Sequence, residues 1–195
     1  MAPFLAPVDK PKGLMLKLVY LFARRQFGKV STPVAVFSAR MPAPFLSFYG
    51  KVGRLDRKLT LSPHTAVLIR QQVASVNACL FCMDVTRFFA MKKSPEDVVR
   101  IDALAQYHTS PLFTDAERAA LDYATELTTT KHVEPDTFAR LARHYGEREI
   151  CEIVWLVASE HLYNITNHAM NIGSDGLCAV PEPPAAELRT VGAGR

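Results

Sequence analysis

Apolar residues recur at three- and four-residue intervals along most of the chain, in blocks separated by prolines and small polar residues. This spacing is typical of amphipathic α-helices. Ser62 and Ser94 are each followed by a proline, as in a helix that has a serine N-cap and proline at its first position. The sequence therefore predicts helices that begin at residues 63 and 95.

Further helix boundaries follow from capping patterns. Thr114 and Glu117, in the stretch TDAE, fit a capping box in which each side chain binds the backbone amide of the other residue. Pro135 opens another block, and Gly146 precedes the run EREICEIVWLVASEHLYNITNHAMNIG, which we expect to end at Gly173. No segment combines sustained apolar–polar alternation with hairpin-turn dipeptides. We therefore predict an all-α fold of about seven or eight helices.

The chain is expected to contain one main domain. Its 195 residues are 49% hydrophobic, which is enough to bury a sizeable core. We predict an N-terminal arm at 1–39, a helical domain at 40–173 and a mobile, Pro-rich tail at 174–195. Three prolines between residues 31 and 45 indicate a broken helical connection from the arm to the domain.

The N-terminal arm is basic. Residues 1–58 carry eleven Lys or Arg against two Asp, a net charge of +9, so the rest of the chain carries −5 of the total of +4. We expect the arm's helix to dock on its own domain or on a sister subunit in preference to a membrane. No nucleic-acid-binding motif accompanies the charge. The apolar positions that predict this helix are Leu14, Leu18, Leu21 and Phe22.

Cysteine usage and hydrophobicity suggest the compartment. Four cysteines are too few and too unevenly spaced for a disulfide scaffold. The first residues lack the basic, apolar and small-residue order of a secretion signal. No apolar run approaches the roughly 18 residues that cross a bilayer. We expect a soluble, cytoplasmic protein without a membrane partner.

The stretch VNACLFCMDVTRFFA, residues 76–90, contains two cysteines three positions apart. Asn77 fits the N-cap of a new helix, which would put Cys79 in the first turn, where free amides and the helix dipole lower a cysteine pKa. Cys79 and Cys82 could then close a small disulfide ring, as in thiol–disulfide oxidoreductases. The alternatives are two buried small hydrophobic side chains or half of a zinc site.

A zinc site would need two further ligands. The sequence offers no second cysteine pair of this spacing, and His161 and His168 are seven residues apart, too far for adjacent ligands on one helix. We therefore expect neither a metal nor another cofactor.

Three segments together resemble a known superfamily. LTLSPHTAVLIRQQVASVNACLFCMDVTRFFA, FTDAERAALDYATELT and HLYNITNHAMNIG, within residues 40–173, are similar to the alkylhydroperoxidase D (AhpD) and carboxymuconolactone decarboxylase superfamily. The resemblance implies an AhpD-like helical bundle that assembles into trimers or hexamers. In the redox members it implies a peroxidase in which the second cysteine, here Cys82, attacks the peroxide. The first, Cys79, resolves the sulfenic acid as a disulfide, which a dithiol reductant protein reduces.

The chain departs from the redox members at the proton relay. Those members carry a glutamate twelve residues before the first cysteine and a histidine four residues after the second; here the two positions hold Val67 and Thr86. Phe81 stands between the cysteines, where a further histidine can occur. Valine carries no proton, and a threonine hydroxyl does not act as a base near neutral pH. The usual relay is therefore absent.

The long C-terminal helix offers a replacement. Glu160, Asn164, Asn167 and His168 follow one another at three- and four-residue steps, and His161 lies beside this stripe. The face either lines a pocket against the cysteine helix, with Glu160 or His161 as base, or ties helices or subunits together through buried hydrogen bonds.

We expect the other chemically capable residues to be structural. Asp84 is predicted to be a surface carboxylate, and Cys151 to belong to the core. The remaining histidines are predicted to be solvated at helix edges or loops: His64, His108, His132 and His144.

Three functions remain open at this stage. The first is a thiol-dependent oxidoreductase that acts on a small peroxide through Cys82 and Cys79. The second is a non-catalytic or redox-sensing helical scaffold. The third is a carboxymuconolactone decarboxylase-like lyase, for which Glu160, His161 and Arg70 are the candidate residues.

Overall fold

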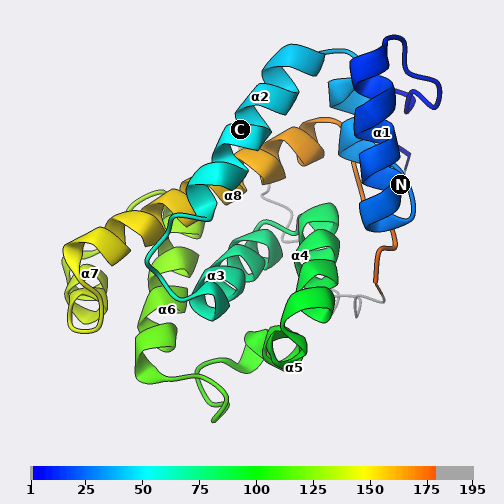
Figure 1. Cartoon of the computed structure of the whole chain (residues 1–195). Coiled ribbons are helices and arrows are strands. Elements are labelled where there is room, and N and C mark those ends of the chain that lie inside the picture. The colour runs from blue at the N-terminus through cyan, green and yellow to red at the C-terminus, as the bar shows by residue number, and fades with distance from the viewer. Residues whose placement is uncertain (1, 179–195) are drawn as a thin grey trace, which may run out of the picture.

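The computed structural model describes residues 2–178, and every regular element within them is helical (Figure 1). Eight α-helices are accompanied by a short π-helix, η1, and a 3-10 turn, η2. The predicted all-α class is confirmed. The elements are α1 (Leu14–Phe27), η1 (Val34–Ser38), α2 (Pro42–Asp56), α3 (Pro63–Val76), α4 (Leu80–Lys93), α5 (Pro95–Asp102), η2 (Leu104–Gln106), α6 (Asp115–Thr130), α7 (Pro135–Ala142) and α8 (Glu147–Ala169).

Local capping signals place most helix starts. Helices α3 and α5 begin at the predicted prolines, although neither preceding serine makes a side-chain cap bond. The capping box at Thr114 is present, since its hydroxyl accepts from the Glu117 amide and the Glu117 carboxylate accepts from the Thr114 amide. Helix α8 ends at Ala169, earlier than predicted. The chain reverses at Asn171, whose φ of 52° is a left-handed conformation that asparagine tolerates.

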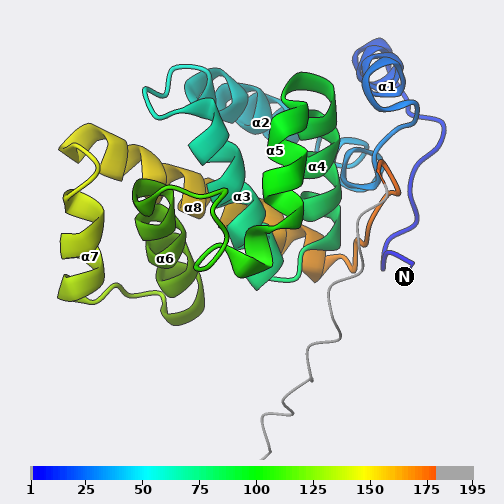
Figure 2. The ribbon, with the colours of Figure 1, turned by 90° about the horizontal axis from the view of Figure 1, so that it is seen from below.

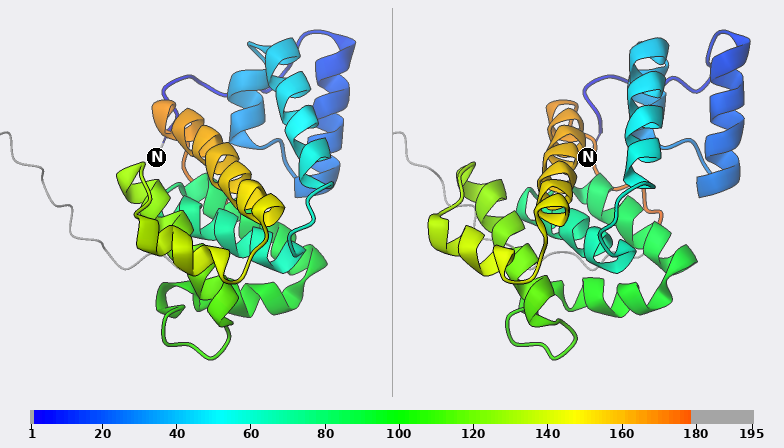
Figure 3. Two further views of the ribbon diagram at one scale, coloured as in Figure 1. Left: turned by 90° about the vertical axis from the view of Figure 1, so that its left-hand side faces the viewer. Right: turned by 60° about the vertical axis from the view of Figure 1, so that its left-hand side comes forward.

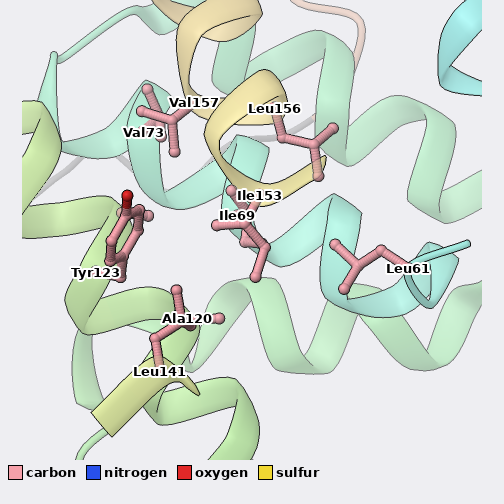
Figure 4. Close-up of a cluster of buried hydrophobic side chains, with 10 residues drawn as sticks. Leu61, Ile69, Val73, Ala120, Tyr123, Leu141, Ile153, Leu156 and Val157 are labelled. Carbon is pink, nitrogen blue, oxygen red and sulfur yellow. The ribbon is translucent and has the colours of Figure 1, made fainter. Parts of the chain in front are cut away.

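The main hydrophobic core lies between α3, α6 and α8. Figure 4 shows side chains from these three helices meeting around Ile69 and Ile153, both fully buried. Such burial supplies most of the stability of a helical bundle, because short helices are marginal in water on their own. The buried members of this core are Leu61, Ile69, Val73, Ala120, Tyr123, Ala124, Leu141, Ile153, Leu156 and Val157.

The N-terminal helices lie beside this core. In Figure 2, α1 stands at one end of the molecule and α7 at the other. The end of α1 is held against α4 by Phe27, whose ring centroid lies 5.4 Å from that of Phe88 and 5.6 Å from that of Phe89. The arm is therefore packed against its own chain at this contact.

The docked face of α1 differs from the predicted one. Its buried residues are Leu16, Tyr20 and Ala23. The apolar residues that the spacing picked out all point to solvent: Leu14, Leu18, Leu21 and Phe22. Helix α1 thus has two apolar faces, and periodicity alone does not tell which of them packs inward.

Asp84 is fully buried, which corrects its prediction as a surface carboxylate. Burial by itself would raise its pKa, but donors from the segment after α8 lower it below the ordinary value. These donors are the Ser174 hydroxyl and the backbone amides of Leu177 and Cys178, each 2.8–2.9 Å from a carboxylate oxygen. The first five residues of the predicted mobile tail are therefore tied to α4, and residues 179–195 lie outside the described part.

Two further predictions need correction. Cys151 is exposed on α8 instead of lying in the core. His64 is only half-exposed, because its Nδ1 lies 2.9 Å from a carboxylate oxygen of the buried Asp97. The other histidines predicted to be solvated are exposed: His108, His132 and His144.

Glu152 fastens α8 to the segment that leads into α3. Its carboxylate accepts hydrogen bonds from the amides of Thr60 and Leu61 and from the Arg148 side chain. Burial alone would raise the Glu152 pKa, but these donors outweigh it and hold the pKa at about 2. A carboxyl with a depressed folded-state pKa stabilises the fold above its unfolded pKa of about 4.3, and this stability is lost as the pH falls toward 2.

We expect Glu152→Gln to lower the free energy of unfolding by about 2 kcal/mol at pH 7, because it removes the charge from a buried, multiply bonded carboxylate. Urea unfolding at pH 7 and pH 2 measures this. The difference between wild type and variant should shrink strongly at pH 2. Glu134→Gln, at an exposed glutamate, is the control. Equal losses from the two substitutions would contradict the assignment.

Candidate active site

The two cysteines lie at the junction between α3 and α4. Asn77 is the C-cap of α3, not the N-cap of α4 as predicted, and Cys79 is the N-cap of α4. Between them, Ala78 has a left-handed φ of 53°, which turns the chain sharply. Helix α4 therefore starts two residues later than expected.

This shift changes which cysteine lies in the first turn of α4. Cys82 lies there instead of Cys79. The free amides of the first turn and the helix dipole favour a thiolate at that position.

Cys79 and Cys82 form a disulfide, with their Cα atoms 5.3 Å apart. Both residues are buried, with Cys79 at 1% and Cys82 at 3% exposure. The Asn164 side-chain amide lies 3.1 Å from Cys82 Sγ, and that of Asn167 lies 3.4 Å from the same sulfur and 3.7 Å from Cys79 Sγ. When the bond is reduced, both amides can donate to a thiolate at Cys82 and stabilise it.

A cavity of about 340 Å³ opens on the Cys82 side of this pair. Cys79 is not among the residues that line it. One wall is aromatic, and Tyr49 of α2 stacks on Tyr163 of α8 with ring centroids 5.0 Å apart. A small molecule in the cavity would therefore meet Cys82 first. The cavity is lined by Pro33, Tyr49, Asp56, Arg70, Phe81, Cys82, Val85, Thr86, Phe89, Glu160, Tyr163 and Asn167.

A partly buried charge network borders the same cavity. Glu160 is 3% exposed, and one of its carboxylate oxygens lies 3.3 Å from Arg70 Nη1. Arg70 also donates to Asp56 at 2.8 Å, and Asp56 accepts from the Trp155 indole at 2.9 Å. Arg70 therefore forms ion pairs with two carboxylates, one from α2 and one from α8.

Glu160 is connected to the sulfur through Asn164. The same Asn164 amide nitrogen lies 2.9 Å from Glu160 Oε1 and 3.1 Å from Cys82 Sγ. Burial raises the Glu160 pKa, and the Arg70 charge and the hydrogen bond from Asn164 reduce the rise without cancelling it. A carboxyl with a raised pKa, next to a cysteine and a cavity, is suited to accepting and releasing a proton.

His161 is connected to the sulfur through more hydrogen bonds than Glu160 is. It does not line the cavity, and its Nδ1 is 3.4 Å from the Asn77 side chain, which in turn donates to Asn164 at 2.8 Å. Burial and the charge of Lys131 lower the His161 pKa. Two amide side chains thus separate this neutral imidazole from Cys82.

We expect Asn77→Ala to destabilise the fold by about 1–2 kcal/mol, because it leaves the buried Asn164 carbonyl without its donor. Urea unfolding of the oxidised protein measures the change. A loss below about 0.5 kcal/mol would show that water or another group replaces the lost bond.

The three positions at which this chain departs from the proton relay do not all lie at the cavity. Thr86 and Phe81 line the cavity, whereas Val67 does not. The carboxylate at the cavity comes from Glu160 on α8. Sequence reasoning missed Tyr49 and Asp56, because they lie in α2, which carries no local motif and comes more than twenty residues before the cysteines. Only the folded arrangement brings them to the site.

Two features that would indicate other kinds of protein are absent from residues 2–178. No helix there is both long and apolar enough to span a membrane. The described residues also contain no group of three or more His, Cys, Asp or Glu side chains that could hold a metal ion. A second hollow, of about 450 Å³, lies over the end of α2, and no cysteine or carboxylate lines it. Its lining residues are Lys51, Arg54, Leu55, Arg57 and Lys58.

The helical bundle has solved counterparts of the same fold. An AhpD-core, peroxidase-related protein from Ralstonia eutropha JMP134 superposes with a TM-score of 0.71 over 91% of this chain and 95% of that one, at 20% identity. A variant of the debrominase Bmp8, in complex with 2,3,4-tribromopyrrole, gives 0.76 over 91% and 94%, also at 20% identity. The protein therefore has the AhpD-like fold.

Sequence similarity places the chain more narrowly. It is 33% identical over 180 residues to the uncharacterized protein YnjA of Escherichia coli (strain K12), covering 91% of this chain and 97% of YnjA. The chain therefore belongs to the YnjA family. No family model matches it.

Proposed function

We propose that this protein is a thiol-dependent oxidoreductase, an alkylhydroperoxidase-like peroxidase in which Cys82 is the nucleophile and Cys79 the resolving cysteine. The observation that carries the proposal is the asymmetry of the pair. Cys82 lines the cavity, and two side-chain amides donate to its sulfur. Cys79 does not line the cavity and is bonded to Cys82 as a disulfide. The resemblance to redox members of the superfamily assigns the same roles.

The reaction balances as follows. The Cys82 thiolate attacks one oxygen of a hydroperoxide, the O–O bond breaks, and the alkoxide leaves as an alcohol after taking up a proton. The Cys79 thiolate then attacks the Cys82 sulfenic acid, and water leaves as the disulfide forms. A dithiol reductant protein supplies the two electrons that regenerate both thiols.

Glu160 handles the proton in this scheme. As a carboxylate it accepts the Cys82 proton through a bound water, because the Asn164 amide donates to both groups and cannot relay a proton. As an acid it gives the proton to the leaving alkoxide in the cavity. Its raised pKa suits both steps, because the carboxylate is a stronger base than that of an ordinary glutamate and the acid form persists to a higher pH. This replaces the relay that Val67 and Thr86 do not supply.

The lyase alternative has weaker support. Such chemistry on a lactone acid needs a free cation to bind the substrate carboxylate. Arg70 lines the cavity, but its charge is already shared by Asp56 and Glu160.

A reductive dehalogenase is the second candidate. The aromatic wall around Cys82 fits a flat halogenated ring, and one structure of the same fold is named a debrominase. The two thiols of the pair would supply two electrons: a carbon–bromine bond is replaced by carbon–hydrogen, bromide leaves, and the disulfide forms.

Turnover with a dithiol reductant tests both candidates. Consumption of an alkyl hydroperoxide by the reduced protein, with formation of the Cys79–Cys82 disulfide, supports the peroxidase. Bromide release from a brominated pyrrole, with no peroxide consumption, would favour the dehalogenase. A disulfide that forms once without turnover of either compound would favour the redox-sensing scaffold.

A further inference from the structure

Arg70 is shared between two carboxylates that come from different helices. Its Nη2 lies 2.8 Å from Asp56 Oδ2 of α2, and its Nη1 lies 3.3 Å from Glu160 Oε2 of α8. Figure 3 (right) shows α2 and α8 beside each other, and the stack of Tyr49 on Tyr163 joins the two helices at the cavity. Arg70 itself belongs to α3, so the three charged side chains connect three helices.

The charges of this group do not balance. One guanidinium cation faces two carboxylates, and all three side chains are largely removed from water. Their exposed fractions are 17% for Arg70, 26% for Asp56 and 4% for Glu160. The arginine cannot neutralise both carboxylates at once, so a proton on one of them relieves the repulsion between the two.

The two carboxylates are not equivalent. Asp56 is the more exposed of the two and has a second donor, the Trp155 indole nitrogen, at 2.9 Å. Glu160 has the longer contact with Arg70 and is almost completely buried. Burial raises the Glu160 pKa, the Arg70 charge lowers it, and the Asp56 charge raises it again. The proton of the pair is therefore expected on Glu160.

The remaining ionisable groups at the cavity have little influence on Glu160 in the oxidised protein. Among the described residues, those that line the cavity besides this group are Cys82 and the phenols Tyr49 and Tyr163. Burial raises the pKa of both phenols, so they are neutral near neutral pH. Cys82 is bonded in the disulfide. The arginine and the aspartate are therefore the charges at the cavity that act on Glu160.

We propose that Asp56 is a positioning residue: by holding Arg70, it leaves Glu160 only part of the arginine charge and so keeps Glu160 able to bind a proton. The inference rests on the proposed function, in which Glu160 takes the Cys82 proton. If Arg70 faced Glu160 alone, the full ion pair would stabilise the carboxylate and weaken it as a base. Asp56 itself exchanges no proton in this scheme.

The oxidised protein permits a direct test, because a titration requires no turnover. Carbon-13 NMR of protein labelled at the glutamate carboxyl carbons follows the protonation of Glu160, and Glu160→Gln identifies its signal. We expect Asp56→Asn to move the midpoint of this titration to lower pH by about one pH unit, since an unshared opposite charge stabilises a carboxylate. Asp56→Glu keeps the charge and should restore most of the wild-type midpoint.

Asp102→Asn is the matched control. Asp102 forms an ion pair with Arg87 at 2.9 Å, and neither residue lines the cavity. We expect this variant to leave the Glu160 midpoint unchanged. Circular dichroism checks that the three aspartate variants fold. A midpoint that Asp56→Asn leaves in place, or that Asp102→Asn moves equally, would overturn the proposal.

The pH dependence of kcat/KM separates this inference from the proposed function. In Asp56→Asn the rise of kcat/KM with pH should move to lower pH with the NMR midpoint, whereas a purely structural role would lower kcat/KM equally at every pH. Complete loss of the rise would make Asp56 the base and overturn its positioning role. A wild type without peroxide turnover would contradict the proposed function, and the NMR titration would still decide whether Asp56 acts on Glu160.

Discussion

Replacing Cys82 by serine is expected to lower peroxide turnover by at least roughly 10³-fold, because the residue that lines the cavity and attacks the substrate is removed. Cys79→Ser should behave differently. It keeps the nucleophile but not its resolving partner, so a Cys82 sulfenic acid should accumulate after one equivalent of peroxide. Peroxide-dependent oxidation of a dithiol measures the first effect, and dimedone labelling followed by mass spectrometry measures the second.

Cys178→Ser provides the control for these variants. Its sulfur bonds to Asp84, which a serine hydroxyl can also do, and it does not line the cavity. We expect this variant to keep wild-type turnover. Dimedone labelling at position 79 in the Cys82→Ser variant, with turnover retained, would reverse the two cysteine roles.

Glu160→Gln is expected to lower turnover about 100-fold at neutral pH, the usual contribution of a positioned acid–base group. In the wild type, the rate should rise through the Glu160 pKa as the pH increases, because the carboxylate must be free to accept the Cys82 proton. Burial raises that pKa, so the rise should lie above the ordinary range of glutamate. The pH dependence of kcat/KM measures it.

In Glu160→Gln, this rise of kcat/KM through the Glu160 pKa should disappear. The rate should instead increase with direct ionisation of the thiol, around pH 8.5 for an ordinary cysteine. Since glutamine keeps the size of the side chain and can still accept from Asn164, the loss reports on the proton and not on packing. His161→Gln provides a comparison, because two amides separate this residue from the sulfur. An equal loss from His161→Gln, with Glu160→Gln unaffected, would move the base to the imidazole.

Local patterns predicted much of the fold. The Ser-Pro starts of α3 and α5 and the capping box at Thr114 were correct, because each depends on residues within one turn of the helix start. Asn77 was assigned to the wrong helix end, because the residues within one turn of it do not distinguish the end of α3 from the start of α4. An asparagine suits either end of a helix, and here the left-handed Ala78 moves the N-cap of α4 two residues later, to Cys79.

Features that depend on distant partners could not be predicted. The burial of Asp84 requires donors that come ninety residues later in the chain. The cysteine pair and Glu160 were found from spacing and from the polar stripe on α8. The tyrosine stack and the pairing of Arg70 with Asp56 arise only when α2 crosses the site, because no sequence signal links α2 to the cysteines.

The contact between Asp84 and residues 174–178 has a practical consequence for anyone who prepares a shortened protein. The helical domain ends at Ala169, and a boundary near residue 173 looks natural from the sequence. A protein that ended there would keep the ionised Asp84 carboxylate buried but lose the hydrogen-bond donors of residues 174–178. Expression clones should therefore run at least through Cys178.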